Sequence, residues 1–150
     1  ERPADAAECY RRAVEHQQTA FEQAPNVQRY RAFLSKHYFN RGRVLRRLGQ
    51  ADLAAQVAME RKALWPGDAQ RLLSVAEELA AAAQQLKSQT DGEVAADRCA
   101  LLAIDTLKES LAAGLTKPEQ LKQSTALAAL RSHPQFVALF NPSSRRQDDP

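Results

Sequence analysis

The segment from Tyr38 to Pro66 restricts the fold of this chain more than any other. Its small and helix-breaking residues stand where two antiparallel helices would need them. Gly42 would allow a neighbouring helix to approach, Gly49 provides the backbone freedom that ends a helix, and Ala54 falls where two helices cross. Pro66 cannot continue the second helix because it lacks a backbone donor. The segment therefore predicts a helix-turn-helix hairpin.

The spacing of Gly42, Leu45, Gly49, Ala54 and Pro66 resembles that of a tetratricopeptide repeat, a helix-turn-helix unit of roughly 34 residues. Such units stack side by side, and each buries its apolar face against its neighbours. They present surfaces to other polypeptides and rarely perform chemistry. The resemblance therefore implies antiparallel helix hairpins stacked in a right-handed superhelix that serves as a binding module.

The composition agrees with a single all-α domain. The chain has 150 residues, of which 44% are hydrophobic and only 6% aromatic. A chain of this length can bury a substantial core. An alanine-rich, aromatic-poor composition favours helices over strands. No apolar run approaches the length that would be needed to span a membrane.

Hydrophobic periodicity predicts five long helices. We expect them at residues 4–23, 27–48, 51–64, 68–86 and 93–113, with a loop or hinge at 87–92. Asp68 is placed to cap the fourth helix and Gly114 to end the fifth. The side chains expected to face inward are Ala7, Tyr10, Val14, Phe21, Ala24, Val27, Tyr30, Leu34, Tyr38, Leu45, Leu48, Leu53, Ala54, Val57, Leu72, Ala76, Leu79, Ala83, Leu86, Val94, Leu101, Ile104 and Leu111.

Three short helices are predicted to follow, at 118–122, 125–131 and 134–140, the first opened by a capping box at residues 116–119. We expect one helical repeat domain over residues 1–140, with hairpins in 1–87 and the last long helix plus a short-helix cap in 92–140. Residues 141–150 lack apolar content and should fray. The apolar residues expected to cover the open end of the helix stack are Leu121, Leu127, Leu130, Phe136 and Phe140.

Two longer stretches resemble a particular protein family. The first contains F-L-S-K-H-Y at 33–38 and E-R-K-A-L-W-P-G-D at 60–68. The second contains A-A-G-L at 112–115 and L-A-A-L-R-S-H-P-Q-F at 127–136. Both resemble the repeat region that follows the kinase domain in many serine/threonine protein kinases of planctomycete bacteria. The likeness covers roughly residues 13–140, although Arg61 stands where the repeat usually has alanine and Arg41 where it usually has leucine.

This resemblance implies a non-catalytic C-terminal region of a larger kinase-like bacterial protein. Its implied role is protein–protein interaction that brings a partner or a substrate to the attached kinase. A purely structural role is the alternative, in which the domain packs on its own kinase domain or mediates oligomers. The chain begins with Glu1 rather than Met, which agrees with the expectation of a fragment.

The sharpest site prediction concerns a row of polar side chains along the second helix. Residues 23–51 contain seven basic side chains and no acidic one. At about 100° per residue, five side chains of this helix fall within roughly 60° of one another, away from its apolar face. Some tetratricopeptide proteins use Lys, Asn and Arg at such positions to clamp carboxylates, and charge-assisted hydrogen bonds suit that role. We therefore predict that an acidic or C-terminal peptide binds at Arg29, Lys36, Asn40, Arg43 and Arg47.

Two other readings of the basic row stay open. Glu8, Glu15 and Glu22 of the first helix have heptad spacing and could pair with Arg43, Lys36 and Arg29 across an antiparallel hairpin. Such a charge zipper would need no ligand, since charge runs are often solvated faces. Nucleic acid is the other candidate. We expect it less because Tyr30, Phe33 and Tyr38 are assigned to packing rather than to base stacking.

Arg41 points toward the apolar side of the second helix. An unpaired charge there would be costly to bury. We therefore expect Arg41 either to reach solvent or to pair with Glu60 or Glu15.

No residue pattern predicts catalysis, a cofactor or a metal. The glycines stand singly, and the kinase motifs G-x-G-x-x-G, H-R-D and D-F-G are absent. His16, His37 and His133 lack the spacing of a metal site. Cys9 and Cys99 are expected to be reduced thiols that pack between helices in a cytoplasmic protein. We therefore expect a binding protein and not an enzyme.

Overall fold

The computed structural model describes residues 2–116 and 119–141, and every regular element within those residues is a helix. This confirms the all-α class. The observed helix ends lie within about one to two residues of the expected ones, which is the usual uncertainty of helix boundaries. The elements are α1 (Pro3–Gln23), α2 (Gln28–Arg47), α3 (Ala51–Ala63), α4 (Ala69–Lys87), α5 (Glu93–Ala112), α6 (Glu119–Gln123), the 3-10 helix η1 (Thr125–Leu130) and α7 (Pro134–Leu139).

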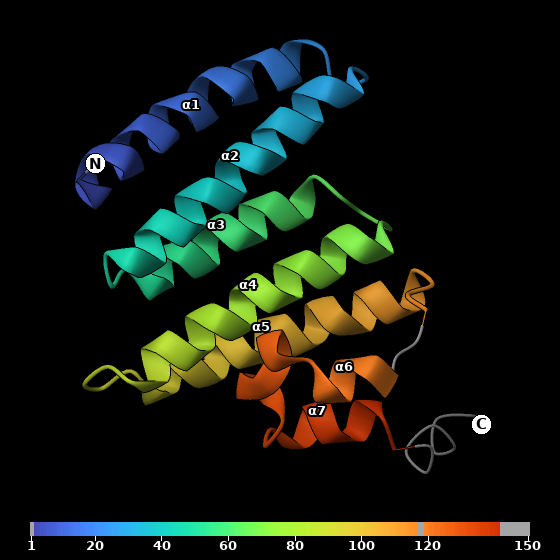
Figure 1. Ribbon diagram of the computed structural model, residues 1–150. Helices are drawn as coiled ribbons and strands as arrows, with labels where there is room; N and C mark the ends of the chain where they lie inside the picture. Colours follow the sequence, from blue (N-terminus) through green and yellow to red (C-terminus); the bar gives the residue numbers. More distant parts are fainter. Residues whose placement is uncertain (1, 117–118, 142–150) are drawn as a thin grey trace.

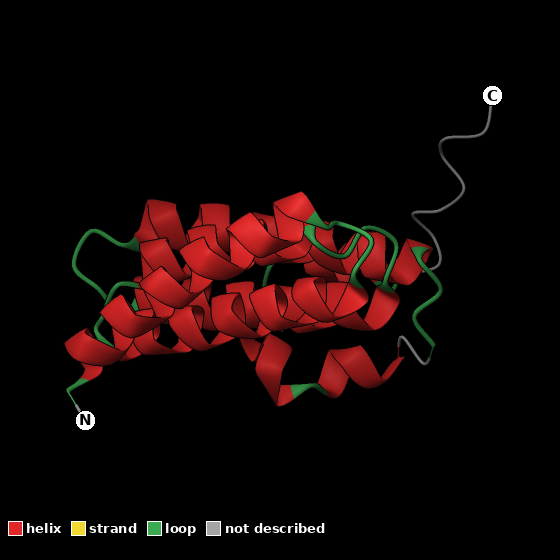
Figure 2. Cartoon of the chain, turned by 90° about the horizontal axis from the view of Figure 1, so that it is seen from above, coloured by secondary structure: helices red, strands yellow, loops and turns green. Residues whose placement is uncertain are grey.

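The five long helices follow one another as antiparallel neighbours (Figure 1). Each of them packs against the next long helix in the chain, from α1 on α2 to α4 on α5. Seen from above, the loops gather at the two ends of the helices (Figure 2). Consecutive helices are therefore joined as hairpins, and the short C-terminal helices lie beside α4 and α5.

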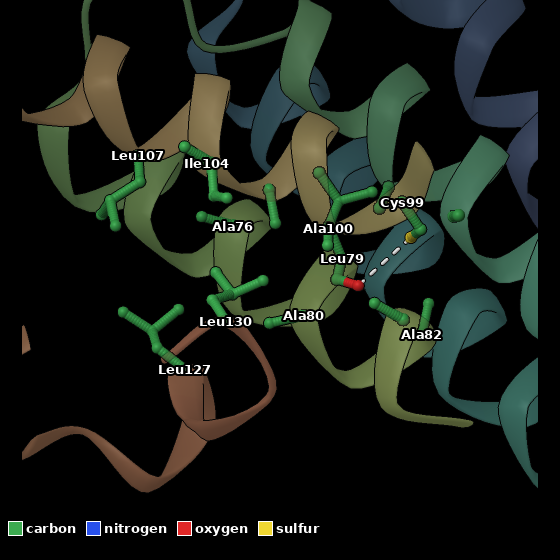
Figure 3. Close-up of a cluster of buried hydrophobic side chains, with 14 of the residues drawn as sticks. Ala76, Leu79, Ala80, Ala82, Cys99, Ala100, Ile104, Leu107, Leu127 and Leu130 are labelled. Atoms are coloured by element: carbon green, nitrogen blue, oxygen red, sulfur yellow. Dashed lines mark hydrogen bonds between the residues drawn. The ribbon is translucent and has the colours of Figure 1, made fainter. Parts of the chain in front are cut away.

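Two hydrophobic clusters form the interior, and α3 contributes to both. The smaller cluster joins α1, α2 and α3 around Leu34, Tyr38 and Leu45. The larger one joins α3, α4, α5 and the C-terminal helices around Leu79 and Ile104 (Figure 3). Small side chains on α3 make this double contact possible, because they let neighbouring helices approach closely. The buried alanines of α3 are Ala51, Ala54, Ala55 and Ala58.

Three residues expected to face inward are exposed, so those assignments were wrong. Leu53 is 45% exposed because α3 turns its alanines, and not its leucine, toward both neighbours. Val27 lies at the N-cap of α2 and Val94 in the first turn of α5, where no other helix covers them. Periodicity identifies the apolar face of a helix, but it does not show where along its length a neighbour ends.

The predicted turns agree with the observed backbone. Gly49 ends the α2 region with a φ of 76°, a left-handed conformation that favours glycine. Gly114 has a φ of 94° after α5. The Asp68 side chain accepts a hydrogen bond from the Arg71 backbone N–H at 2.9 Å, as expected of an N-cap. Residues 88–92 form the loop between α4 and α5.

The C-terminal helices cover the larger cluster as expected. Leu127 and Leu130 of η1 are fully buried, and η1 packs on α4. Phe136 and Phe140 meet edge to face, with ring centroids 5.1 Å apart. The helix expected at 125–131 is a 3-10 helix rather than an α-helix. The capping box at 116–119 and the frayed tail at 141–150 fall largely outside the described residues.

A buried polar network lies between α2, α3 and α4. Arg61 of α3 pairs with Glu78 of α4, and both side chains are about 6% exposed. Arg61 Nε donates to Ser35 Oγ at 3.1 Å, and its Nη1 donates to Ser74 Oγ at 3.2 Å. The guanidinium also stacks on the Phe39 ring, 5.2 Å from its centroid. The substitution of arginine for alanine in the repeat pattern was the only sequence signal for this network.

Removing one member of the ion pair should destabilise the fold strongly. Burial raises the pKa of Glu78, while the Arg61 and Arg46 cations oppose that shift. Without Arg61, the carboxyl group would be buried with its main partner missing. We expect Arg61→Ala to lower the free energy of unfolding by about 3–5 kcal/mol, as for other broken buried pairs. Urea denaturation followed by circular dichroism measures this change.

The matched control removes both charges. Arg61→Met/Glu78→Leu removes both charges of the buried pair and leaves only the half-buried Arg46 without the Glu78 carboxylate, so it should retain far more stability than Arg61→Ala. A double variant less stable than the single one would show that the pair does not act as a unit.

Two glycines should respond in opposite ways to alanine. A Cβ on Gly42 would lie 3.8 Å from Glu78 Oε2 and 3.9 Å from the Ala54 carbonyl oxygen, which are ordinary contacts. Gly42→Ala should therefore stabilise α2 by about 0.5–1 kcal/mol. Gly49→Ala should destabilise by about 1–2 kcal/mol because of its positive φ. Thermal and urea unfolding test both substitutions. A loss of stability in Gly42→Ala would show that the space beside Gly42 does not accept a methyl group.

Candidate partner-binding surface

The five predicted site residues lie on one side of α2, which we call the basic face (Arg29, Lys36, Asn40, Arg43 and Arg47). The four charged members are exposed, and Asn40 is partly buried. The opposite side of α2 holds the buried Leu34, Tyr38 and Leu45. Helical periodicity explains this separation, because every member of the basic face is about half a turn away from the core side chains.

The charge zipper between α1 and α2 is not present. Glu8 accepts hydrogen bonds from Arg11 and Arg12, and these bonds lower the pKa of Glu8 to about 2. Glu15 pairs with Arg11, and Glu22 accepts from Gln18. The acids of α1 therefore bind partners within their own helix. Side chains three or four residues apart are neighbours on a helix surface, which explains why these acids find partners within α1.

The cations of the basic face have no carboxylate partner among the described residues. Two of them stack on aromatic rings of their own helix instead. The Arg29 guanidinium lies 5.9 Å from the Phe33 centroid, and the Arg43 guanidinium lies 5.7 Å from the Phe39 centroid. Stacking orients a guanidinium without neutralising it. Its N–H groups stay available to an external acceptor.

Phe33 is 45% exposed, so its assignment to the interior was wrong. It lies beside Arg29 on the exposed side of α2, between two turns of the basic face. An exposed phenylalanine within a charged surface adds apolar area to a surface that would otherwise attract only charge. Nucleic acid was expected less because the aromatic rings of α2 were assigned to packing. Phe33 is exposed, so that reason does not apply to its ring.

A small hollow adjoins the C-terminal half of the basic face. It has a volume of about 160 Å³ and is lined by Tyr10 of α1 and by Asn40, Arg43, Val44 and Arg47 of α2. Its lining therefore combines three members of the basic face with a tyrosine and a valine. A hollow of this size can take one side chain of a partner.

Three other arginines of α2 lie off the basic face, and they are Arg31, Arg41 and Arg46. Arg41 is partly buried and forms no ion pair with Glu60 or Glu15 within the described residues, so of its two expected outcomes the ion pair is not observed. Arg31 lies over the Phe21 and Trp65 rings, 5.8 Å from each centroid. Its Nε is buried without an acceptor. Sequence reasoning did not identify this aromatic cradle.

The two cysteines differ in their surroundings. Both are free thiols. Cys99 is buried, donates to the Leu79 carbonyl oxygen at 3.2 Å (Figure 3), and has its pKa raised by burial to about 11. Cys9 is exposed, so its assignment to helix packing was wrong. Among the described residues, no helix is both long and apolar enough to cross a bilayer, and no group of His, Cys, Asp and Glu could hold a metal.

Comparison with protein-family models, curated proteins and solved structures finds no match to this chain. The function is therefore inferred from the geometry of α2 and its neighbours.

Reversing two charges on the basic face should leave the fold intact. Lys36 and Arg43 form no ion pair within the described chain, although Arg43 would lose its stacking on Phe39. Lys36→Glu/Arg43→Glu should therefore lower the free energy of unfolding by no more than about 1 kcal/mol. Relief of like-charge repulsion on α2 favours a small gain. Urea denaturation of both proteins at low salt measures the difference. A larger loss of stability would indicate that these cations have a carboxylate partner within the chain.

Proposed function

We propose that this chain is a non-catalytic protein–protein interaction module that binds an acidic polypeptide on the basic face of α2. One observation supports this most strongly: four exposed cations share one side of a helix and have no carboxylate partner within residues 2–116 and 119–141. Isolated charges on a surface are common. A row of unneutralised cations on a helix without any acid is attractive to an external anion.

The helix arrangement supports the same proposal. Antiparallel hairpins that stack along the chain form a rigid surface, and the proposed array is a tetratricopeptide-like right-handed superhelix. In such an array α2 is the first helix of a pair and lines the groove. The resemblance to the region that follows planctomycete kinase domains then assigns a role: holding a partner or substrate near an attached kinase.

The chemistry of recognition would be charge-assisted hydrogen bonding. Lys36 and Arg43 donate to carboxylates, and Asn40 lies between them with an amide that can both donate and accept. Hydrogen bonds to charged groups contribute about 1.5–3 kcal/mol each. Exposed charges are screened by salt, so the affinity should fall as the ionic strength rises.

Binding to poly-L-glutamate tests this proposal. We expect the wild-type chain to bind with an affinity that falls between low and physiological salt. Lys36→Glu/Arg43→Glu should weaken binding by at least about tenfold, because it removes two charge-assisted contacts. Isothermal titration calorimetry gives the affinities, and circular dichroism verifies that each variant is folded.

The control variant has the same net charge as Lys36→Glu/Arg43→Glu but carries its substitutions away from the basic face. Lys87→Glu/Arg98→Glu reverses two exposed cations on α4 and α5 that form no ion pair among the described residues. It should bind poly-L-glutamate nearly as well as the wild type. Equal loss in both variants would mean that only overall charge matters. A single-stranded oligonucleotide that binds more tightly than the acidic polymer would assign the surface to nucleic acid instead.

A further inference from the structure

The exposed side of α2 has a regular spacing that extends beyond the basic face. Phe33 falls in line with its five residues. The six positions are separated by steps of four, three, four, three and four residues, which is the spacing of the positions through which one helix faces another in a coiled coil. They are Arg29, Phe33, Lys36, Asn40, Arg43 and Arg47.

The dimensions of this row match a helical partner. With a rise of about 1.5 Å per residue, the row is about 27 Å long. Arg29, Lys36 and Arg43 recur every seven residues, so they stand about 10.5 Å apart along the axis. Carboxylates spaced seven residues apart on a neighbouring helix have the same interval. Each could therefore meet one cation.

An extended peptide fits the cations less well. Side chains on one face of a strand recur about every 6.7 Å. The 10.5 Å interval falls midway between multiples of that distance. When one carboxylate of a strand faces Arg29, the next ones lie to either side of Lys36. A strand would therefore neutralise alternate cations, whereas a helix would neutralise all three.

Two features of the surface would receive apolar side chains. Phe33, at 45% exposure, lies between Arg29 and Lys36. The hollow beside Tyr10 and Val44 lies near the other end of the row. The row lies on α2, which is 20 residues long and packs beside the 21-residue α1, so a partner helix has room to lie along it (Figure 1).

We infer that the occupant of this row is an α-helix of a partner protein that carries carboxylates at seven-residue intervals and an apolar side chain against Phe33. This inference rests on the proposed function, because it specifies the acidic polypeptide that the basic face binds. The acidic side chains of the partner follow from charge complementarity with the row. Its helical form follows from the spacing of the cations, and its apolar side chain follows from the exposure of Phe33.

Three synthetic peptides test the inference with the full chain. The first is a helix-forming peptide of about 21 residues, or three heptads, with Glu every seventh residue and one Leu per heptad on the same face. The second has the same composition with two interior prolines that prevent the helix. The third is helical with the same composition, but its Glu residues are distributed around all faces. Calorimetry gives each affinity at physiological salt.

We expect the first peptide to bind at least about tenfold more tightly than the other two, because its carboxylates are already placed for contact. Phe33→Ala should weaken that binding by about tenfold, in proportion to the apolar surface removed. Leu53→Ala removes an equally exposed apolar side chain from α3 and should leave the affinity unchanged.

The outcomes separate this inference from the proposed function. Equal binding of the heptad and proline-containing peptides, both lost in Lys36→Glu/Arg43→Glu, would overturn the helical partner and leave the acidic polypeptide in place. Equal binding of the two helical peptides would overturn the seven-residue register. No binding of any peptide, or of poly-L-glutamate, would overturn both.

Discussion

The close contact of α3 with both α2 and α4 is the constraint on which the rest of the structure depends. Alanines on α3 bring the helices together, and they connect the two hydrophobic clusters into one interior. Arg61 crosses this contact and pairs with Glu78. A buried pair of this kind adds little stability compared with apolar packing, but it is costly to mismatch. It therefore fixes which faces of α2, α3 and α4 meet.

The orientation of α2 follows from that contact. Ser35 accepts hydrogen bonds from Arg61 Nε and from Trp65 Nε1, at 3.1 and 2.9 Å. The Gln85 side chain of α4 donates to the Arg46 carbonyl oxygen at 2.7 Å near the other end of α2. With both ends of the helix held, the side opposite Leu34 and Leu45 must face solvent. The basic face is therefore held on a helix that its neighbours fix in place, which would lower the entropy lost on binding the proposed partner.

Most of the fold could be predicted from the sequence, because the signals are local. Gly49, Pro66 and Asp68 mark helix ends through backbone freedom, a missing donor and a capping carboxylate. The exposure of Leu53 and Val94 could not be predicted, since it depends on which helices are neighbours and where they end. For the candidate site, helical periodicity correctly placed the five residues of the basic face on one side of α2. The partners of Glu8 and Glu15 were missed because heptad spacing does not show that Arg11 satisfies both acids within one helix.

Several basic residues of α2 stand at positions where they disfavour the helix. Its first turn contains no acid and carries Arg29 near the positive end of the helix dipole. Arg43 and Arg47 are like charges four residues apart, which destabilises a helix by about 0.2–0.5 kcal/mol. With glutamine at these positions, α2 would be at least as stable. Departures from the local preferences that favour a fold are expected at functional sites. Here no carboxylate of the described residues pairs with these cations, which agrees with the proposed acidic partner as the source of the compensating charge.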